Sequence, residues 1–170
     1  MVDSQQKYEN SQYVVFTMAE ESFGIEIARV REIMKVPEIT AMPGMAEFIE
    51  GIIYLRDRVV PVYDLRKQFG IKTDSQDSRI IIYEMESGNI AGLIVDAVDE
   101  ILTVAGDRLE SVENKFGSES ASYIKNVGVL DDDRLLLVLE LDQLLSAQQK
   151  ISLSEVSEIA SQEKQQKENE

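Results

Sequence analysis

Apolar and polar positions alternate with a period of two in many short segments of the chain, as in β-strands that bury one face. The apolar positions are rich in β-branched and aromatic residues, and polar turn residues separate the segments. No long segment shows the 3.6-residue period of an amphipathic helix, so barrels or a sandwich are favoured over alternating strands and helices. The pattern predicts four hairpins, with strand pairs at 13–18 and 23–27, 51–55 and 59–62, 80–85 and 90–95, and 127–130 and 134–139.

Only short turns are expected between these hairpins. After residue 27 the apolar positions allow a helical turn, but Pro37 holds Val36 in extended geometry, which predicts a kinked turn followed by another strand. Single helical turns are predicted at 44–49 and 107–112. Pro61 lacks a backbone donor and is expected at a sheet edge or a bulge.

The two halves of the chain resemble each other. Two segments of the first half have counterparts in the second half, in the same order. Chance alternation could produce either match alone, but both together favour an internal duplication and two similar small barrels. The segment RVVPVYDL from Arg58 is echoed by RLLLVLEL from Arg134. In the other echo, Gly24, Ile27, Val30, Glu32 and Ile33 recur with identical spacing as Gly92, Val95, Val98, Glu100 and Ile101.

The change in composition along the chain suggests its domain organisation. A polar linker at 72–78 separates two expected subdomains, at about 12–72 and 78–146, and exchange of strands between them is left open. Residues 1–11 are expected to be a flexible N-terminus. Residues 147–170 are mostly polar and are expected to be disordered or weakly helical.

The composition of the chain argues against several classes of function. The 170 residues include no cysteine and no histidine, which excludes disulfides, thiolate zinc sites and the usual general base at neutral pH. The net charge of −15 argues against binding to nucleic acid or anionic membranes. The apolar runs are too short to span a bilayer and the first ten residues lack a signal-peptide pattern, so a cytoplasmic location is expected.

Catalytic machinery is not recognisable in the sequence, and no metal or cofactor is expected. The run Asp131-Asp132-Asp133 cannot converge on one cation and is interpreted as a solvated hairpin tip. Asp96, Asp99 and Glu100 lack an accompanying nucleophile or metal ligand and are interpreted as surface acids. A small β-barrel enzyme and a nucleic-acid-binding barrel are therefore both disfavoured.

The predicted hairpin around Arg56 and Arg58 is the most informative segment. Arginines at an exposed tip of so acidic a chain are candidates for contacts with a partner protein, although they could equally offset nearby acids. If the strand that carries Glu32 lies beside this hairpin, Glu32 and Arg56 could form an ion pair.

Four segments together resemble the CheW family of chemotaxis coupling proteins, and the resemblance runs from about residue 12 to residue 146. The usual glycine of the family's hairpin tip is Asp57 here, and aspartate tolerates the left-handed turn geometry better than most residues. The four segments are FGIEIARVREIMKV from Phe23, EGIIYLRDRVVPVYDLRKQFG from Glu50, AGLIVDAVDEIL from Ala91 and DDDRLLLVLELDQLL from Asp131.

The resemblance implies an all-β fold of two five-stranded SH3-like barrels on a shared apolar core. It also implies a non-enzymatic adaptor, without cofactors, that binds both the regulatory domain of a CheA-type histidine kinase and the cytoplasmic tips of methyl-accepting chemoreceptors. Such an adaptor would reach the receptor arrays through its partners. By motif, the receptor-facing residues would be Val30, Glu32, Ile33, Arg56 and Val98. The kinase-facing strand edges would lie around Asp57 and Ile80.

Two alternatives stay close to this function. One is a two-barrel interaction module in another receptor and kinase pathway. The other is a CheV-like coupling protein that lacks a receiver domain, because the chain ends before such a domain could fit.

Overall fold

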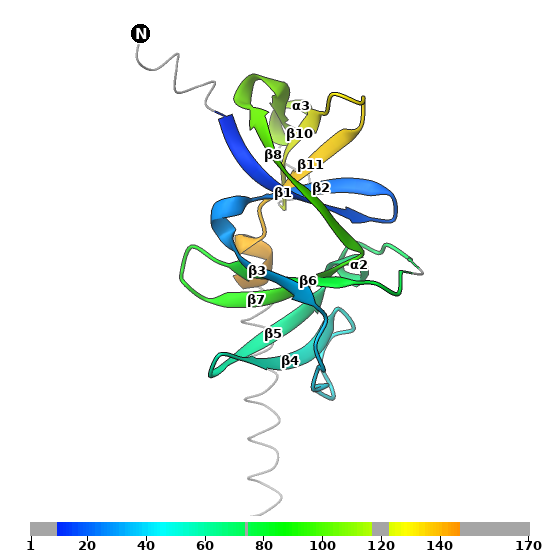
Figure 1. The fold of residues 1–170 in the computed structure, drawn as a ribbon, viewed down its shortest axis with the longest axis vertical. Helices are drawn as coiled ribbons and strands as arrows, with labels where there is room; N and C mark the ends of the chain where they lie inside the picture. Colours follow the sequence, from blue (N-terminus) through cyan, green and yellow to red (C-terminus); the bar gives the residue numbers. More distant parts are fainter. Residues whose placement is uncertain (1–9, 74, 117–122, 147–170) are drawn as a thin grey trace, which may run out of the picture.

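The computed structural model describes residues 10–73, 75–116 and 123–146, which form two β-sheets and several short helical segments (Figure 1). The fold is two SH3-like subdomains, as expected, although the short strand β9 gives one sheet a sixth strand. The five-stranded sheet has the order β3-β6-β7-β5-β4, and the six-stranded sheet has the order β8-β1-β2-β11-β10-β9. The strands are β1 (Asn10–Met18), β2 (Glu21–Glu26), β3 (Val30–Lys35), β4 (Ile49–Leu55), β5 (Arg58–Asp64), β6 (Arg79–Glu84), β7 (Ile90–Val95), β8 (Ala97–Ala105), β9 (Leu109–Ser111), β10 (Ile124–Val129) and β11 (Leu135–Leu139).

The division of strands between the sheets does not follow the expected boundary at 72–78. The first hairpin, β1 and β2, lies in the sheet of β8 to β11, and the β6–β7 hairpin lies in the sheet of β3 to β5. Each subdomain therefore combines a hairpin from one half of the chain with strands from the other half. The polar linker 72–78 lies within the five-stranded subdomain, so it connects two strands of one sheet instead of separating two sheets.

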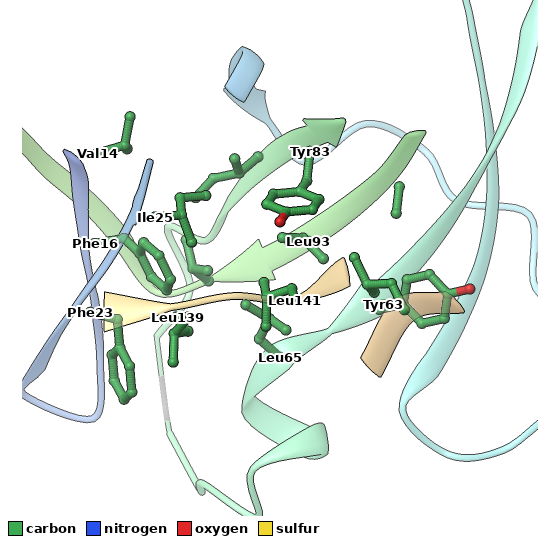
Figure 2. Packing of buried hydrophobic residues seen from close by; sticks show 14 of the residues in the cluster. Val14, Phe16, Phe23, Ile25, Tyr63, Leu65, Tyr83, Leu93, Leu139 and Leu141 are labelled. Carbon is green, nitrogen blue, oxygen red and sulfur yellow. The ribbon is translucent and has the colours of Figure 1, made fainter. Parts of the chain in front are cut away.

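Alternate residues of the central strands enter different apolar cores. In β1, Val14 and Phe16 face a core that both sheets share, whereas Val15 faces the interior of the six-stranded subdomain. In β6, Ile81 faces the shared core and Ile80 the interior of the five-stranded subdomain. Figure 2 shows the shared core, in which side chains from β1, β2, β5, β6, β7 and β11 meet. Strands buried on both faces explain the nearly continuous apolar runs in the sequence.

The structure repeats the duplication that the sequence predicts. Gly24 in β2 pairs in parallel with Val138, and Gly92 in β7 pairs in parallel with Val62. A Cβ atom on Gly92 would lie 2.6 Å from Cδ1 of Ile80, so a larger residue there would displace this buried side chain. Equivalent glycines thus mark equivalent crossings of the two halves.

Two local predictions are wrong. Residues 44–48 form turns and a bend without a helix, with Gly44 at a φ of +82°, and Ile49 already begins β4. Residues 107–112 do not form one helix: a 3-10 turn, η2 (Gly106–Arg108), leads into β9, and helix α3 (Val112–Phe116) follows. Pairing of β9 with β10 overrides the local helical pattern.

The other predicted elements agree with the structure. All four hairpins form, and the kinked turn after residue 27 is the 3-10 turn η1 (Ile27–Arg29). Helix α2 (Leu65–Gln68) follows β5, and residues 142–146 are helical. Flexibility was predicted for residues 1–11, but Asn10 and Ser11 already belong to β1. Residues 1–9 and the predicted disordered or weakly helical end at 147–170 lie outside the described part of the chain. Within that part, no helix is long and apolar enough to cross a membrane.

Candidate protein-interaction site

Strands β3 and β8 carry most of the predicted receptor-facing residues, and each contains a β-bulge at the same place of the repeat. The bulged residue is Arg31 in β3 and Asp99 in β8. Both side chains bond the strand opposite: Arg31 holds Glu84 in a two-point ion pair at 2.6 and 2.9 Å, and Thr17 donates to Asp99. The hydrogen bonds from Arg31 are the main reason why the pKa of Glu84 is lowered. Bulges locally increase the twist of a strand and redirect its side chains.

The apolar residues of β3 and β8 lie at the rim of the shared core and on the surface beside it. Val30 and Val98 are half-buried and pack against the same core from opposite sheets. Three residues further on, Ile33 is 38% exposed and Ile101 is 56% exposed. One apolar pair is therefore partly core, and the other is accessible to a partner.

A Glu–Arg ion pair accompanies the apolar residues in each subdomain. Glu32 of β3 lies 3.3 Å from Arg56 at the tip of the β4–β5 hairpin, which confirms the predicted pairing. Glu100 of β8 lies 3.6 Å from Arg134 at the tip of the β10–β11 hairpin. Both pairs join a bulged strand to the hairpin of the same barrel. They are solvent-exposed, so they orient side chains more than they stabilise the fold.

The tip that carries Arg56 is a two-residue turn. Arg56 has a φ of +48° and Asp57 a φ of +65°, and the flanking residues Leu55 and Arg58 pair directly. These values are those of a type I′ turn, in which glycine is preferred at the second position. The hydroxyl of Tyr54 donates to the Asp57 carboxylate at 3.2 Å. The turn thus keeps its left-handed geometry with aspartate and gains an exposed charge.

Replacing Asp57 by glycine is expected to raise the free energy of unfolding by about 1 kcal/mol, because glycine adopts a positive φ without steric cost. Loss of the exposed hydrogen bond from Tyr54 offsets only a small part of this gain. Urea denaturation of Asp57→Gly beside the wild type measures the change. Asp131→Gly is a suitable control, because Asp131 is exposed and its φ is not positive. A destabilised Asp57→Gly protein would contradict the prediction.

One residue predicted to face the kinase does not lie on the surface. Ile80 is fully buried in the interior of the five-stranded subdomain, so its side chain cannot contact a partner. Ile80 and Ile81 point to opposite faces of β6, and each face is covered by an apolar core, so both side chains are buried. The accessible apolar residues of this subdomain include Tyr54, 73% exposed, and its cross-strand partner Val59, 62% exposed.

The sequence contained signals for several residues that were not predicted. Ile101 and Glu100 echo Ile33 and Glu32, so the duplication that identified one set could have identified the other. An exposed cross-strand pair, Val129 and Leu135, also repeats the Tyr54–Val59 pair at the other hairpin. Each subdomain therefore presents an apolar residue on its bulged strand and an apolar pair beside its hairpin tip.

Acidic side chains in the described ranges show no arrangement suited to a metal: no group of three or more is placed to hold an ion. The Asp131–Asp133 run is exposed at a hairpin tip, as predicted. Asp96 is an exception to the prediction of surface acids, because it is only 8% exposed. The arrangement on β3, β8 and the hairpin tips is suited to protein recognition: apolar anchors bordered by charged side chains.

Comparison with known proteins identifies relatives over most of the chain. The family model described as "CheW-like domain" matches residues 12–149. The chemotaxis protein CheW of Thermotoga maritima is 30% identical over 132 residues, covering 76% of this chain and 84% of its own. That of Klebsiella aerogenes is 27% identical over 139 residues, covering 81% of this chain and 83% of its own.

A solved structure resembles the fold. The crystal structure of the scaffolding protein TtCheW from Thermoanaerobacter tengcongensis superimposes with a TM-score of 0.69 at 38% identity, covering 78% of this chain and 90% of that one. The match of the family model extends over both subdomains and includes β3, β8 and both hairpin tips. The chain therefore belongs to the CheW-like family.

Proposed function

We propose that this protein is a non-enzymatic coupling protein that binds the regulatory domain of a CheA-type histidine kinase and the cytoplasmic tips of chemoreceptors. The observation that carries the proposal is the matched pair of surfaces on β3 and β8. They place Ile33 and Ile101 on the surface beside one shared core, with a Glu–Arg pair in each subdomain. Relatives named as chemotaxis proteins and as a scaffolding protein support the same function.

The receptor site in this proposal extends over both subdomains. Val30, Glu32 and Ile33 contribute from β3, Val98 and Ile101 from β8, and Arg56 orients Glu32. Apolar side chains supply the contact area, and the charged pairs determine the register of the bound receptor. The affinity of a receptor that contacts both strands then depends on how the subdomains are packed against each other.

The kinase site in this proposal lies on the β4–β5 hairpin. Asp57 stays a candidate because its carboxylate is exposed at the tip, and Tyr54 and Val59 replace the buried Ile80 as the apolar contacts. This site belongs to one subdomain and leaves β8 accessible. The protein can then hold receptor and kinase at the same time, in the cytoplasm and beside the receptor arrays.

Calorimetric titration with a receptor-tip fragment and with the kinase regulatory domain tests the proposal. Ile33→Glu and Ile101→Glu are each expected to weaken receptor binding about 100-fold, because a charge would have to be desolvated in an apolar contact. Kinase binding is expected to stay unchanged. Thr103→Glu is a matched control, because it adds the same charge at another exposed position of β8.

Charge reversal tests the role of the Glu32–Arg56 pair. Glu32→Arg and Arg56→Glu are each expected to weaken receptor binding roughly tenfold, and the double reversal is expected to restore part of the loss, because the ion pair re-forms. Wild-type protein that binds neither partner would refute the proposed function. Receptor binding that tolerates both Ile33→Glu and Ile101→Glu would place the receptor site elsewhere.

A further inference from the structure

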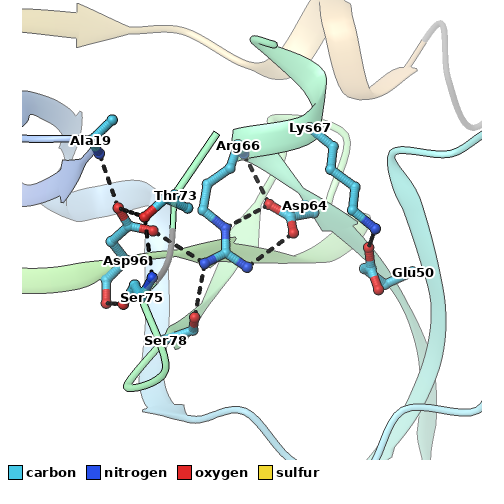
Figure 3. A network of polar contacts seen from close by, with 9 residues as sticks. All are labelled: Ala19, Glu50, Asp64, Arg66, Lys67, Thr73, Ser75, Ser78 and Asp96. Atoms are coloured by element: carbon cyan, nitrogen blue, oxygen red, sulfur yellow. Dashed lines mark hydrogen bonds and ion pairs between the residues drawn. The ribbon is translucent and has the colours of Figure 1, made fainter. Parts of the chain in front are cut away.

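Asp96 occupies the point where the chain crosses from the five-stranded to the six-stranded sheet. It lies between β7 and β8 and is almost completely buried. Its carboxylate accepts hydrogen bonds from the backbone N–H of Ala19 at 2.9 Å, the hydroxyl of Thr73 at 2.8 Å and Nη1 of Arg66 at 3.1 Å (Figure 3). Ala19 belongs to the β1–β2 turn of one subdomain, and the other two donors belong to the other. A single carboxylate therefore connects the two bodies.

The position of Arg66 is fixed before it reaches Asp96. Its guanidinium makes a two-point contact with Asp64 at 2.9 and 3.0 Å and donates to Ser78 at 2.9 Å. Asp64 also accepts from the backbone N–H of Arg66 and so caps helix α2. Burial acts to raise the pKa of Asp96, but the hydrogen bonds from Ala19, Thr73 and Arg66 outweigh it and the pKa is lowered. Asp96 is thus held in its charged form.

A related contact lies where the chain leaves β11. After β11 the chain leaves the six-stranded sheet, and Asp142 accepts from the hydroxyl of Tyr83 at 2.6 Å and from the backbone N–H of Glu86 at 2.9 Å. Glu86 lies in the β6–β7 turn of the five-stranded subdomain. At these two places an aspartate on the departing chain binds the hairpin turn of the opposite subdomain. The crossing from β2 to β3 passes through η1 instead.

These directed contacts complement the shared apolar core. Burial of apolar surface is non-directional and does not by itself set the angle between two packed bodies. Charge-assisted hydrogen bonds have strict geometry and specify one arrangement. We infer that Asp96 is a positioning residue that fixes the angle between the two subdomains, and thereby the spacing of β3 and β8.

The consequence for binding rests on the proposed function. Because the proposed receptor site spans both subdomains, loss of the hydrogen bonds to the Asp96 carboxylate should weaken receptor binding. The proposed kinase site lies on the β4–β5 hairpin alone, so kinase binding should be insensitive to the same change. This difference separates a positioning role from a general loss of folding, which would impair both partners.

Distance measurement between two spin labels tests the inference without any partner. The chain has no native cysteine, so Val59→Cys and Val129→Cys introduce single labels at exposed sites of the two subdomains. We expect one narrow distance distribution in this labelled protein and a broadened or shifted one when Asp96→Asn is added. Asparagine has nearly the same shape, but its amide nitrogen cannot accept the bonds that one carboxylate oxygen accepts. Arg31→Gln, which removes an ion pair within one sheet, should leave the distribution unchanged.

An unchanged distribution in folded Asp96→Asn protein would overturn the inference. If Asp96→Asn does not fold, Thr73→Val removes one of the three bonds at constant shape, and the same criterion applies to it. Titrations with the receptor fragment and the kinase domain follow, with receptor affinity expected to fall roughly tenfold and kinase affinity to be retained. A wild-type protein that binds no receptor would refute the proposed function, while the distance measurement would still decide the role of Asp96.

Discussion

Replacing Leu93 by alanine is expected to lower the free energy of unfolding by about 2–5 kcal/mol, the range for large-to-small changes in well-packed cores. Leu93 is fully buried on β7 and faces the shared core. Its neighbours on the adjacent strands are Tyr63 on β5 and Ile81 on β6, which face the same core. Truncation therefore leaves a cavity in the shared core, to which both sheets contribute side chains. Urea denaturation followed by circular dichroism measures the loss.

The same substitution tests whether the subdomains unfold as one unit. Because the shared core contains residues of both sheets, Leu93→Ala should shift a single transition without splitting it. Ile82→Ala, in the interior of the five-stranded subdomain alone, is the comparison, and Leu135→Ala at an exposed position is the control for the mutation itself. Two separate transitions in Leu93→Ala protein, or a loss no larger than that of Leu135→Ala, would contradict a cooperative shared core.

Gly51→Ala is expected to destabilise the protein by about 3 kcal/mol, through backbone strain and a steric clash together. Gly51 has a φ of +143°, and a Cβ atom there would lie 2.0 Å from the carbonyl oxygen of Thr40. That oxygen accepts a hydrogen bond from the N–H of Ile52, in the bridge that joins the segment after β3 to the outer strand β4. The substitution therefore disrupts a contact between the two edges of the five-stranded sheet.

A second glycine provides a control for the strain alone. Gly88 also has a positive φ, of +91°, but no atom lies within 4 Å of where its Cβ would be. Gly88→Ala should lower the free energy of unfolding by only about 1 kcal/mol. Thermal unfolding of both variants separates the two contributions, and equal losses in both would show that the contact with Thr40 is unimportant. Because β3 and the β4–β5 hairpin carry Glu32 and Arg56, Gly51→Ala should also weaken receptor binding more than Gly88→Ala does.

Much of the candidate site could be predicted from the sequence because its signals are local or repeated. The alternation of apolar residues identified all four hairpins, and the tip composition identified Arg56 and Arg58. The duplication identified Val30 and Val98 as equivalent, and both pack at the rim of the shared core. The resemblance to CheW proteins supplied the expected partners, which no local pattern contains.

Other features could not be predicted, because they depend on which distant segments meet. The resemblance placed Ile80 at a kinase-facing strand edge, but Ile80 is buried because β6 has a core on each of its faces. Asp96 has the sequence neighbourhood of a surface acid, and only the crossing between sheets buries it against Arg66. The predicted helical turn at 107–112 gave way to β9 because β10 was available to pair with it.

The sequence by itself determined the strand content, the hairpins, the duplication and the absence of thiol and imidazole chemistry, because these follow from composition and from periodicity over a few residues. The tertiary structure alone decided that each hairpin pairs with the other half of the chain and that one core is common to both subdomains. It also decided that Asp96, after β7, and Asp142, after β11, each bind the hairpin turn of the opposite subdomain. Strand pairing joins backbone groups far apart in the chain, and those groups are the same at every residue, so local side-chain patterns do not show which strands will meet.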